Sequence, residues 1–464
     1  MVTRLVIALW LSWCPMLMSV HAAPTNLVFI VVDDLGYGDL GSYGHPWIQS
    51  PNLDKLAESG VRFTDYYAAS ALCSPSRAAM LTGRHPYRSG IKSWIPANSG
   101  VYLRDAEVTL AELLQEKGYA TALIGKWHLN SDLGHEAEPQ PNDQGFDYFY
   151  GHNAFQTPTN RDPDNLFRNR EKLPVQVGYT ADIYAKESIR WLQKRSGQQP
   201  FFLMLSMAEP HTPIENPPDM NAIYAAHTKG NIIPIPSGLP AAPKPLLKPR
   251  GPGEYFANVT TLDQGIGQVI DYLELTDLRS STLIVFVSDN GPVTDDWINW
   301  YEVNAYGSTA GLRGRKHFLY EGGIKVPALI SQPGVIPEGV TSDLVFSGVD
   351  WLATLGTLLG FDLPSDRALD SVDITPALLA DQSLQPRSLH WALPTPNGYD
   401  YAIRDNDLKL LLDADQRPSA LYDLKADPLE MFNLITSRSA DVRRLAAKHR
   451  TFFEAVRQDP LRPK

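Results

Sequence analysis

The chain has 464 residues, of which 43% are hydrophobic and 10% aromatic, and its formal net charge is −11. This length suits one large domain with a smaller second one, and the apolar content is ample for a buried core, which excludes a largely disordered chain. The acidic balance, without any run rich in lysine and arginine, argues against a nucleic-acid-binding protein.

Residues 1–22 predict a secretory signal peptide. Arg4 precedes an apolar run from Leu5 to Val20, and small residues follow at a plausible cleavage site before Ala23. The length of the run favours a cleaved signal over a membrane anchor. We therefore expect an exported protein without a stable membrane span, in a periplasmic, secreted or lysosomal location that depends on the host.

Four apolar runs predict strands that are buried on both faces, at residues 26–32, 120–124, 201–206 and 282–287. Helical patterns lie between them, at residues 53–58, 110–116, 179–193 and 255–273. This alternation predicts an α/β fold with a large, mostly parallel central sheet flanked by helices. A stretch with seven prolines, residues 234–252, predicts an extended surface excursion.

The C-terminal part has a different character. Short strand-like pieces occur at residues 389–392, 401–403, 409–412 and 421–424, and an amphipathic helix follows at 440–457. We expect a smaller α+β domain at residues 376–464, after a catalytic domain at residues 23–375.

Each of the four expected core strands ends in polar groups suited to binding a metal or an anion. These groups are Asp33 and Asp34, Lys126 and His128, His211, and Asp289 and Asn290. Ligands bind at the carboxyl ends of the strands in such sheets, so we expect one site there.

The two pairs of oxygen donors indicate a metal site. Asp33 and Asp34 repel each other unless they are separated, protonated or bridged by a cation, and Asp289 with Asn290 repeats the arrangement. A simple turn at the strand end is the alternative for the aspartates. Oxygen donors suit Ca²⁺ or Mg²⁺, and we favour Ca²⁺ because exported proteins meet it at higher concentration.

Cys73 remains as a single thiol once Cys14 leaves with the signal peptide. Such a thiol is either inert and buried or reactive. We expect Pro75 to fix a turn and Ser76 to cap a helix that carries Arg77. Cys73 would then lie at a helix N-terminus beside a guanidinium, which favours a reactive role.

Residues 73–84 read Cys-Ser-Pro-Ser-Arg-Ala-Ala-Met-Leu-Thr-Gly-Arg. The Cys-x-Pro-Ser-Arg start and the Leu-Thr-Gly-Arg end resemble the signature of type I sulfatases, which share an alkaline-phosphatase-like fold. Further ordered matches to this family occur at residues 33–39, 125–128, 145–147, 210–213, 288–291, 316 with 320–323, and 421–424 with 427–428.

The resemblance implies that Cys73 is oxidised to formylglycine by a separate maturation enzyme. It also implies one divalent cation, held by Asp33, Asp34, modified Cys73, Asp289 and Asn290. One oxygen of the formylglycine hydrate would attack sulfur, with Asp289 as its base.

The same resemblance implies roles for the basic residues. Arg77 would support the hydrate, and Lys126 and Lys316 would neutralise sulfate oxygens. His211, aided by Lys316, would protonate the departing alcohol, and His128 would remove the second hydroxyl proton to expel sulfate.

Substrate contacts are expected in the segment after Gly151, which reaches the active site in the family. We expect His152, Asn153 and Gln156 to touch the substrate. His85, His135 and His317 lie outside the matching motifs, and we interpret them as structural.

Together these features predict a sulfuric ester hydrolase acting on a sulfated small molecule or glycan, with a sulfated carbohydrate favoured. The alternatives are a small-molecule arylsulfatase, a phosphoester hydrolase of the same superfamily, and an inactive protein that binds sulfated glycans. A phosphoester hydrolase needs a serine or threonine nucleophile and usually a histidine-rich two-metal site, and the sequence offers neither. The inactive protein is disfavoured by the intact set of Cys73, Arg77, Lys126, His128, His211 and Lys316.

Overall fold

The computed structural model describes residues 26–195, 199–227, 252–293, 304–380 and 382–463. The expected signal peptide, and the proline-rich segment apart from Pro252, lie outside the described residues. No helix in the described ranges is long and apolar enough to cross a membrane.

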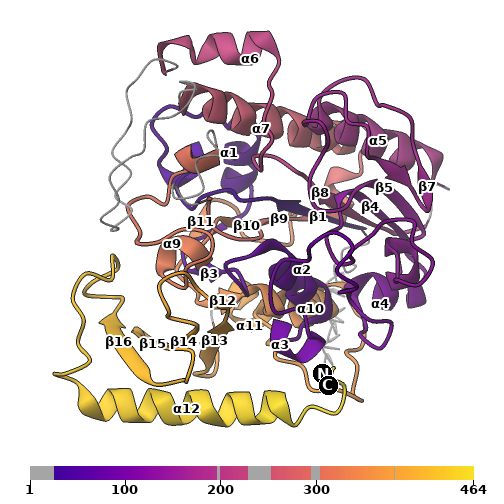
Figure 1. Cartoon of the computed structure of the whole chain (residues 1–464). Helices are drawn as coiled ribbons and strands as arrows, with labels where there is room; N and C mark the ends of the chain where they lie inside the picture. Colours follow the sequence, from indigo (N-terminus) through magenta and orange to yellow (C-terminus); the bar gives the residue numbers. More distant parts are fainter. Residues whose placement is uncertain (1–25, 196–198, 228–251, 294–303, 381, 464) are drawn as a thin grey trace, which may run out of the picture.

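A ten-stranded mixed sheet forms the centre of the larger part (Figure 1). Its order is β11 (Val340–Ser342), β2 (Val61–Phe63), β10 (Ala328–Ser331), β9 (Thr282–Ser288), β1 (Asn26–Val32), β8 (Phe201–Ser206), β4 (Ala120–Lys126), β5 (Tyr148–His152), β6 (Phe167–Arg168) and β7 (Glu171–Lys172). The middle strands β9, β1, β8, β4 and β5 are parallel, whereas β10 and β6 pair antiparallel at either side. The prediction of a mostly parallel central sheet is confirmed.

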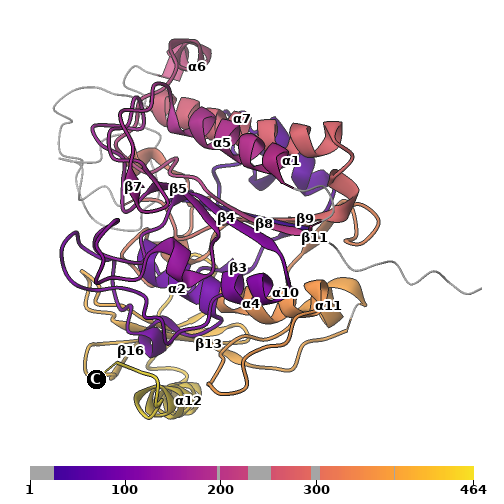
Figure 2. The same ribbon diagram turned by 90° about the vertical axis from the view of Figure 1, so that its right-hand side faces the viewer.

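Helices cover both faces of this sheet (Figure 2). One face carries α1 (Pro51–Glu58), α5 (Thr180–Lys194) and α7 (Pro252–Leu275), and the other carries α2 (Cys73–Thr82), α4 (Leu110–Glu116) and α10 (Trp351–Leu359). Shorter elements are β3 (Tyr66–Tyr67), α3 (Pro86–Ser89), α6 (Pro218–Ile223), α9 (Glu321–Ile324), β12 (Phe346–Ser347) and α11 (Thr375–Leu379).

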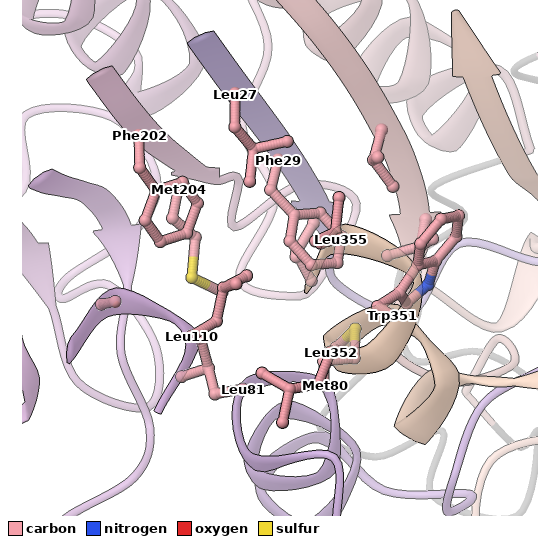
Figure 3. Close-up of a cluster of buried hydrophobic side chains, with 14 of the residues drawn as sticks. Leu27, Phe29, Met80, Leu81, Leu110, Phe202, Met204, Trp351, Leu352 and Leu355 are labelled. Carbon is pink, nitrogen blue, oxygen red and sulfur yellow. The ribbon is translucent and has the colours of Figure 1, made fainter. Parts of the chain in front are cut away.

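Strand β1 contributes to a hydrophobic core on each side of the sheet. Because successive side chains point to opposite faces, Leu27 and Phe29 enter the core that contains α2, α4 and α10, and Val28 and Ile30 enter the other. In the first core, Phe29 meets Trp351 of α10 edge to face, with ring centroids 5.9 Å apart (Figure 3).

Helix α2 is fixed beneath the sheet by this core. Met80 and Leu81 insert into it, and all ten residues of α2 are buried (Figure 3). This packing anchors α2 in the core and thereby positions its first residue, Cys73.

A four-stranded antiparallel sheet and a long helix form the C-terminal part. The strands are β13 (Ser388–Ala392), β14 (Tyr401–Asp405), β15 (Leu408–Leu412) and β16 (Pro418–Asp423), and the helix is α12 (Ser439–Arg457). The expected α+β character is confirmed, while the boundary at residue 375 stays a prediction. Lys409 joins the two parts, because its Nζ lies 2.9 Å from Glu321 and 3.0 Å from Glu430.

Three histidines are packed together between α12, β13 and the start of α3. His390 stacks on Phe452, and its ring centroid lies 5.9 Å from that of His449. Neither ring nitrogen of buried His449 has a hydrogen-bond partner among the described residues. Burial lowers the pKa of His85 and of His449 to about 4, so both are neutral at pH 7.

Replacing His449 with phenylalanine is expected to make the protein less sensitive to acid. The unfolded histidine has a pKa of about 6.5, so the unfolded chain binds more protons and stability falls as the pH drops from about 6.5 towards 4. One such residue accounts for up to about 3 kcal/mol. Thermal unfolding at pH 7.5 and 4.5 measures the effect, with His135→Phe, at an exposed position, as the control. If Tm fell by the same amount between pH 7.5 and pH 4.5 in both variants, the prediction would be wrong.

Candidate active site

The carboxyl ends of the parallel strands meet at one edge of the sheet, as predicted. The gathered residues are Asp33 and Asp34 after β1, Lys126 and His128 at β4, His211 after β8, and Asp289 and Asn290 after β9. Strand β4 can approach β8 this closely because residue 125 is glycine, with a φ of +116°. A Cβ there would lie 1.8 Å from the carbonyl oxygen of Ser206.

Helix α2 begins at Cys73, so the expectation that Ser76 caps this helix is wrong. The Ser76 hydroxyl instead donates to the carbonyl oxygen of Ser70 at 2.9 Å and accepts from its N–H at 3.1 Å. The helix can start before Pro75 because the first turn needs no acceptor for the missing N–H of proline. The expected position of Cys73 at the N-terminus of the helix is confirmed.

The Cys73 thiol is a poor nucleophile as encoded. It is 2% exposed, its Sγ donates to Asp33 Oδ1 at 3.4 Å, and it accepts from Lys316 Nζ at 3.3 Å. Burial, and then the charge of Asp33, raise the pKa of Cys73 to about 12. Placement beside a helix start therefore does not produce a thiolate at neutral pH.

Four buried side chains could share one cation. Asp33, Asp34, Cys73 and Asp289 each offer a ligand atom, and these atoms all lie within 4.8 Å of one another. Burial, and then the neighbouring charge of Asp33, raise the pKa of Asp289 to about 7. A divalent cation relieves such crowding of carboxylates.

Asn290 completes this donor set. Its amide nitrogen donates to Asp34 Oδ1 at 2.6 Å, whereas its buried Oδ1 has no hydrogen-bond partner among the described residues. An unpaired buried carbonyl oxygen beside carboxylates is a fitting ligand for a hard cation. The residues predicted to hold Ca²⁺ or Mg²⁺ thus come together in a suitable arrangement.

Three basic side chains surround the carboxylates. Lys126 Nζ lies 2.6 Å from Asp33, Lys316 Nζ lies 2.6 Å from Asp34, and Arg77 Nε lies 2.9 Å from Asp289. Burial alone would raise the pKa of Asp33, but Lys126 and the other cations hold it well below its usual range.

Arg77 also connects α2 to the sheet. It donates to Ser206 Oγ at 2.6 Å and to the carbonyl oxygen of Lys126 at 3.2 Å. Its Nη2 is buried without a hydrogen-bond partner among the described residues. One guanidinium nitrogen therefore remains to bind a further oxygen in the site.

The two histidines expected to move protons differ in their hydrogen bonds. His128 Nε2 lies 3.1 Å from the carbonyl oxygen of Ile95, so this nitrogen carries the proton. Burial, and then Lys126, lower the pKa of His128 well below its usual value, which leaves Nδ1 unprotonated. His211 Nδ1 donates to the carbonyl oxygen of Thr212 at 2.5 Å, and its Nε2 lies 3.7 Å from Asp34.

A pocket of about 130 Å³ opens at this site. Four of the predicted residues line it, namely Cys73, His128, His211 and Lys316. The rest of its lining consists of Leu72, Trp94, Ala154, Phe155, Val293 and His317. Burial lowers the pKa of His317 to about 4, so this residue is neutral at pH 7.

The three expected substrate contacts do not line this pocket. His152 forms a 2.7 Å hydrogen bond with Tyr184, and Asn153 donates to the carbonyl oxygen of Asn130 at 2.9 Å. Gln156 is buried, and neither of its amide atoms has a partner among the described residues. Their contact with substrate stays a prediction, although Phe155, within the same segment, does line the pocket.

Sequence reasoning missed Trp94 and Phe155 and interpreted His317 as structural. Phe155 lies between Asn153 and Gln156, which were both expected to contact substrate, and this position could have identified it. For Trp94, the only signal in the sequence was a large aromatic residue among polar neighbours.

The similarity to known proteins, in sequence and in fold, extends over most of this chain. A family model described as Sulfatase matches residues 25–361. Human arylsulfatase A is 34% identical over 451 residues, which cover 89% of this chain and 84% of that protein. Canine N-acetylgalactosamine-6-sulfatase is 31% identical over 383 residues, covering 77% of this chain and 67% of that protein.

Solved structures extend the similarity to the fold. The crystal structure of Ps i-CgsB in complex with k-i-k-neocarrahexaose is 28% identical, with a TM-score of 0.78, and the match covers 93% of this chain and 92% of that one. The phosphonate monoester hydrolase of Agrobacterium radiobacter is 20% identical, with a TM-score of 0.67, over 93% of this chain and 96% of that one. The latter similarity concerns the fold alone.

Proposed function

This chain belongs to the sulfatase family and is a sulfate ester hydrolase, and from that premise we propose that it releases inorganic sulfate from a sulfated carbohydrate through a hydrated formylglycine made from Cys73. The observation that carries the proposal is the convergence of Cys73 with acidic and basic side chains in one buried cluster. Its buried thiol is protonated as encoded, so the chemistry needs another group at residue 73.

The formylglycine hydrate offers two hydroxyl groups on one carbon. The oxygen of the first attacks sulfur, and the bond from sulfur to the alcohol oxygen breaks. Removal of the proton from the second hydroxyl then expels sulfate and restores the aldehyde, which water hydrates again. A serine at this position could perform only the first half of the cycle.

A divalent cation, Ca²⁺ in preference to Mg²⁺, would be held by Asp33, Asp34, Asp289, Asn290 and modified residue 73. When bound, it supplies positive charge that polarises the sulfate ester and acidifies a hydroxyl. The preference for Ca²⁺ rests on the oxygen donors and on an exported location, which we also propose.

The chain's own side chains would transfer the protons and stabilise charge. Asp289 accepts the proton of the attacking hydroxyl, and Arg77 Nη2 donates to the hydrate. Lys126 and Lys316 neutralise the sulfate oxygens.

The two histidines would act in succession. Nε2 of His211, once protonated, gives its proton to the departing alcohol, and Lys316 aids this step. Nδ1 of His128 then takes the proton of the second hydroxyl, which suits a nitrogen that is unprotonated at neutral pH.

Two relatives support a sugar as the substrate. One is named N-acetylgalactosamine-6-sulfatase, and the other was crystallised in complex with k-i-k-neocarrahexaose. An aryl substrate is the second candidate, because arylsulfatase A is also a relative. A phosphoester hydrolase has only fold similarity in its favour, and a higher kcat/KM for 4-nitrophenyl phosphate than for 4-nitrophenyl sulfate would support it.

Mass spectrometry of the Cys73 peptide tests the proposal directly. Exchange of the thiol for an aldehyde is expected to lower the peptide mass by about 18 Da in protein from its native source. Protein produced without the maturation enzyme provides the control, because it keeps the thiol and lacks activity. A native-source protein that carries only the thiol and releases no sulfate would refute the mechanism.

A further inference from the structure

Two aromatic side chains project from the pocket lining into solvent. Trp94 is 44% exposed and Phe155 is 49% exposed, although both rings are large and apolar. Among the described residues, neither ring packs against another aromatic ring. Part of each ring is therefore accessible to a molecule that enters the pocket.

The backbone that carries Trp94 is tied to the reaction centre. The N–H of the next residue, Ile95, donates to Ser74 Oγ in α2 at 3.1 Å. The carbonyl oxygen of Ile95 accepts from His128 at 3.1 Å. The backbone beside Trp94 is thus held in place relative to α2 and His128.

The loop that carries Phe155 is held in a similar way. Asn165 Nδ2 donates to the carbonyl oxygen of Phe155 at 2.8 Å, and the Asn165 side-chain oxygen accepts from the N–H of Thr157 at 3.0 Å. Because this backbone is already fixed, little conformational freedom is lost when the ring binds a ligand.

The described lining offers no basic group for a second anion. Lys316 is paired with Asp34, His211 and His128 face the sulfate site, and the other lining residues are uncharged at pH 7. A further sulfate or carboxylate on the substrate would lose water without gaining a cationic partner from this described lining.

We propose that Trp94 and Phe155 form an aromatic clamp for a sulfated sugar ring that carries one sulfate ester and no other charged group. The inference rests on the proposed function and narrows its substrate class. The apolar C–H face of the ring stacks on the aromatic side chains, while its single ester reaches Cys73. For an adjacent uronic acid or a second sulfate, the described part of the lining offers no counter-charge.

Matched pairs of hexosamine sulfates test the charge requirement. Each pair has its ester at the 3-, 4- or 6-position, and its members differ only in an N-acetyl or an N-sulfate group. For the pair with the preferred ester position, we expect kcat/KM to be at least about tenfold higher for the N-acetylated member. Higher activity on the N-sulfated member would overturn the proposal.

Alanine variants test the clamp. Trp94→Ala and Phe155→Ala are each expected to raise KM for the N-acetylated sugar about tenfold, with kcat changed less than about threefold. The Ki of inorganic sulfate, which lacks a ring, should stay the same. Trp94→Phe and Phe155→Tyr should keep most of the affinity, and Phe432→Ala, at a 73% exposed position outside the pocket, is the matched control.

Alanine variants with an unchanged KM would overturn the clamp. Formylglycine-bearing enzyme that hydrolyses 4-nitrophenyl sulfate but none of the sugars would overturn the sugar assignment and leave the sulfatase mechanism intact. Failure on every sulfate ester, by contrast, would refute the proposed function itself.

Discussion

Replacing Cys73 with serine is expected to reduce steady-state sulfate release by at least about 10⁴-fold. Serine can attack the ester once, but the sulfated product has no second hydroxyl for His128 to deprotonate. The side chain at residue 73 is 2% exposed, so bulk water has little access to hydrolyse that product. Intact-mass measurement after incubation with substrate should show a gain of about 80 Da, one sulfo group per chain.

Cys73→Ala is the control for this result, because it offers no oxygen and should gain no mass. Both substitutions are small and lie at the first residue of a fully buried helix, so equal Tm values would show that the fold is retained. Sustained turnover by the serine variant, within about tenfold of the mature enzyme, would mean that the second hydroxyl is unnecessary.

The core of the fold could be predicted from the sequence because its strands are buried on both faces. The apolar runs identify β1, β4, β8 and β9 to within two residues of their ends. The last two strands at one side of the sheet, β6 and β7, have two residues each, which is too short for any periodic pattern. They form because neighbouring chain segments come together, and local sequence carries no signal for that.

The clustering of the residues expected to bind metal and transfer protons could be predicted for a related reason. Asp34 and Asp289 are 255 positions apart, yet both follow parallel strands, and parallel strands bring their carboxyl ends together. The helix start was less predictable. Ser76 has the right chemistry for a cap, but Ser70 engages its hydroxyl, and that contact depends on the folded loop.

The pocket wall and the state of the thiol depend on tertiary structure. The position of Trp94 follows from hydrogen bonds that Ile95 makes with Ser74 and His128. The high pKa of Cys73 follows from burial, which its position at a helix start does not reveal.

Replacing His211 with asparagine is expected to lower kcat/KM for a sugar sulfate by about 10² to 10⁴-fold. A sugar alkoxide is a poor leaving group, because its conjugate acid is a very weak acid, and it needs the proton of His211. A 4-nitrophenolate ion, with a conjugate acid of pKa about 7, leaves without it. The loss on 4-nitrophenyl sulfate should therefore stay below about tenfold, and parallel kinetics on the two substrates measure the difference.

The geometry explains why His211 can serve as an acid although burial lowers its pKa in the free enzyme. Its Nδ1 donates to the carbonyl oxygen of Thr212, so the proton to be transferred resides on Nε2, 3.7 Å from Asp34. An anionic ester entering beside these carboxylates favours the protonated ring. His135→Asn, at an exposed site, is the matched control. An equal loss on both substrates would show that His211 only positions the ester, and the acid would then have to be sought in Lys316, whose Nζ lies 3.3 Å from Cys73 Sγ.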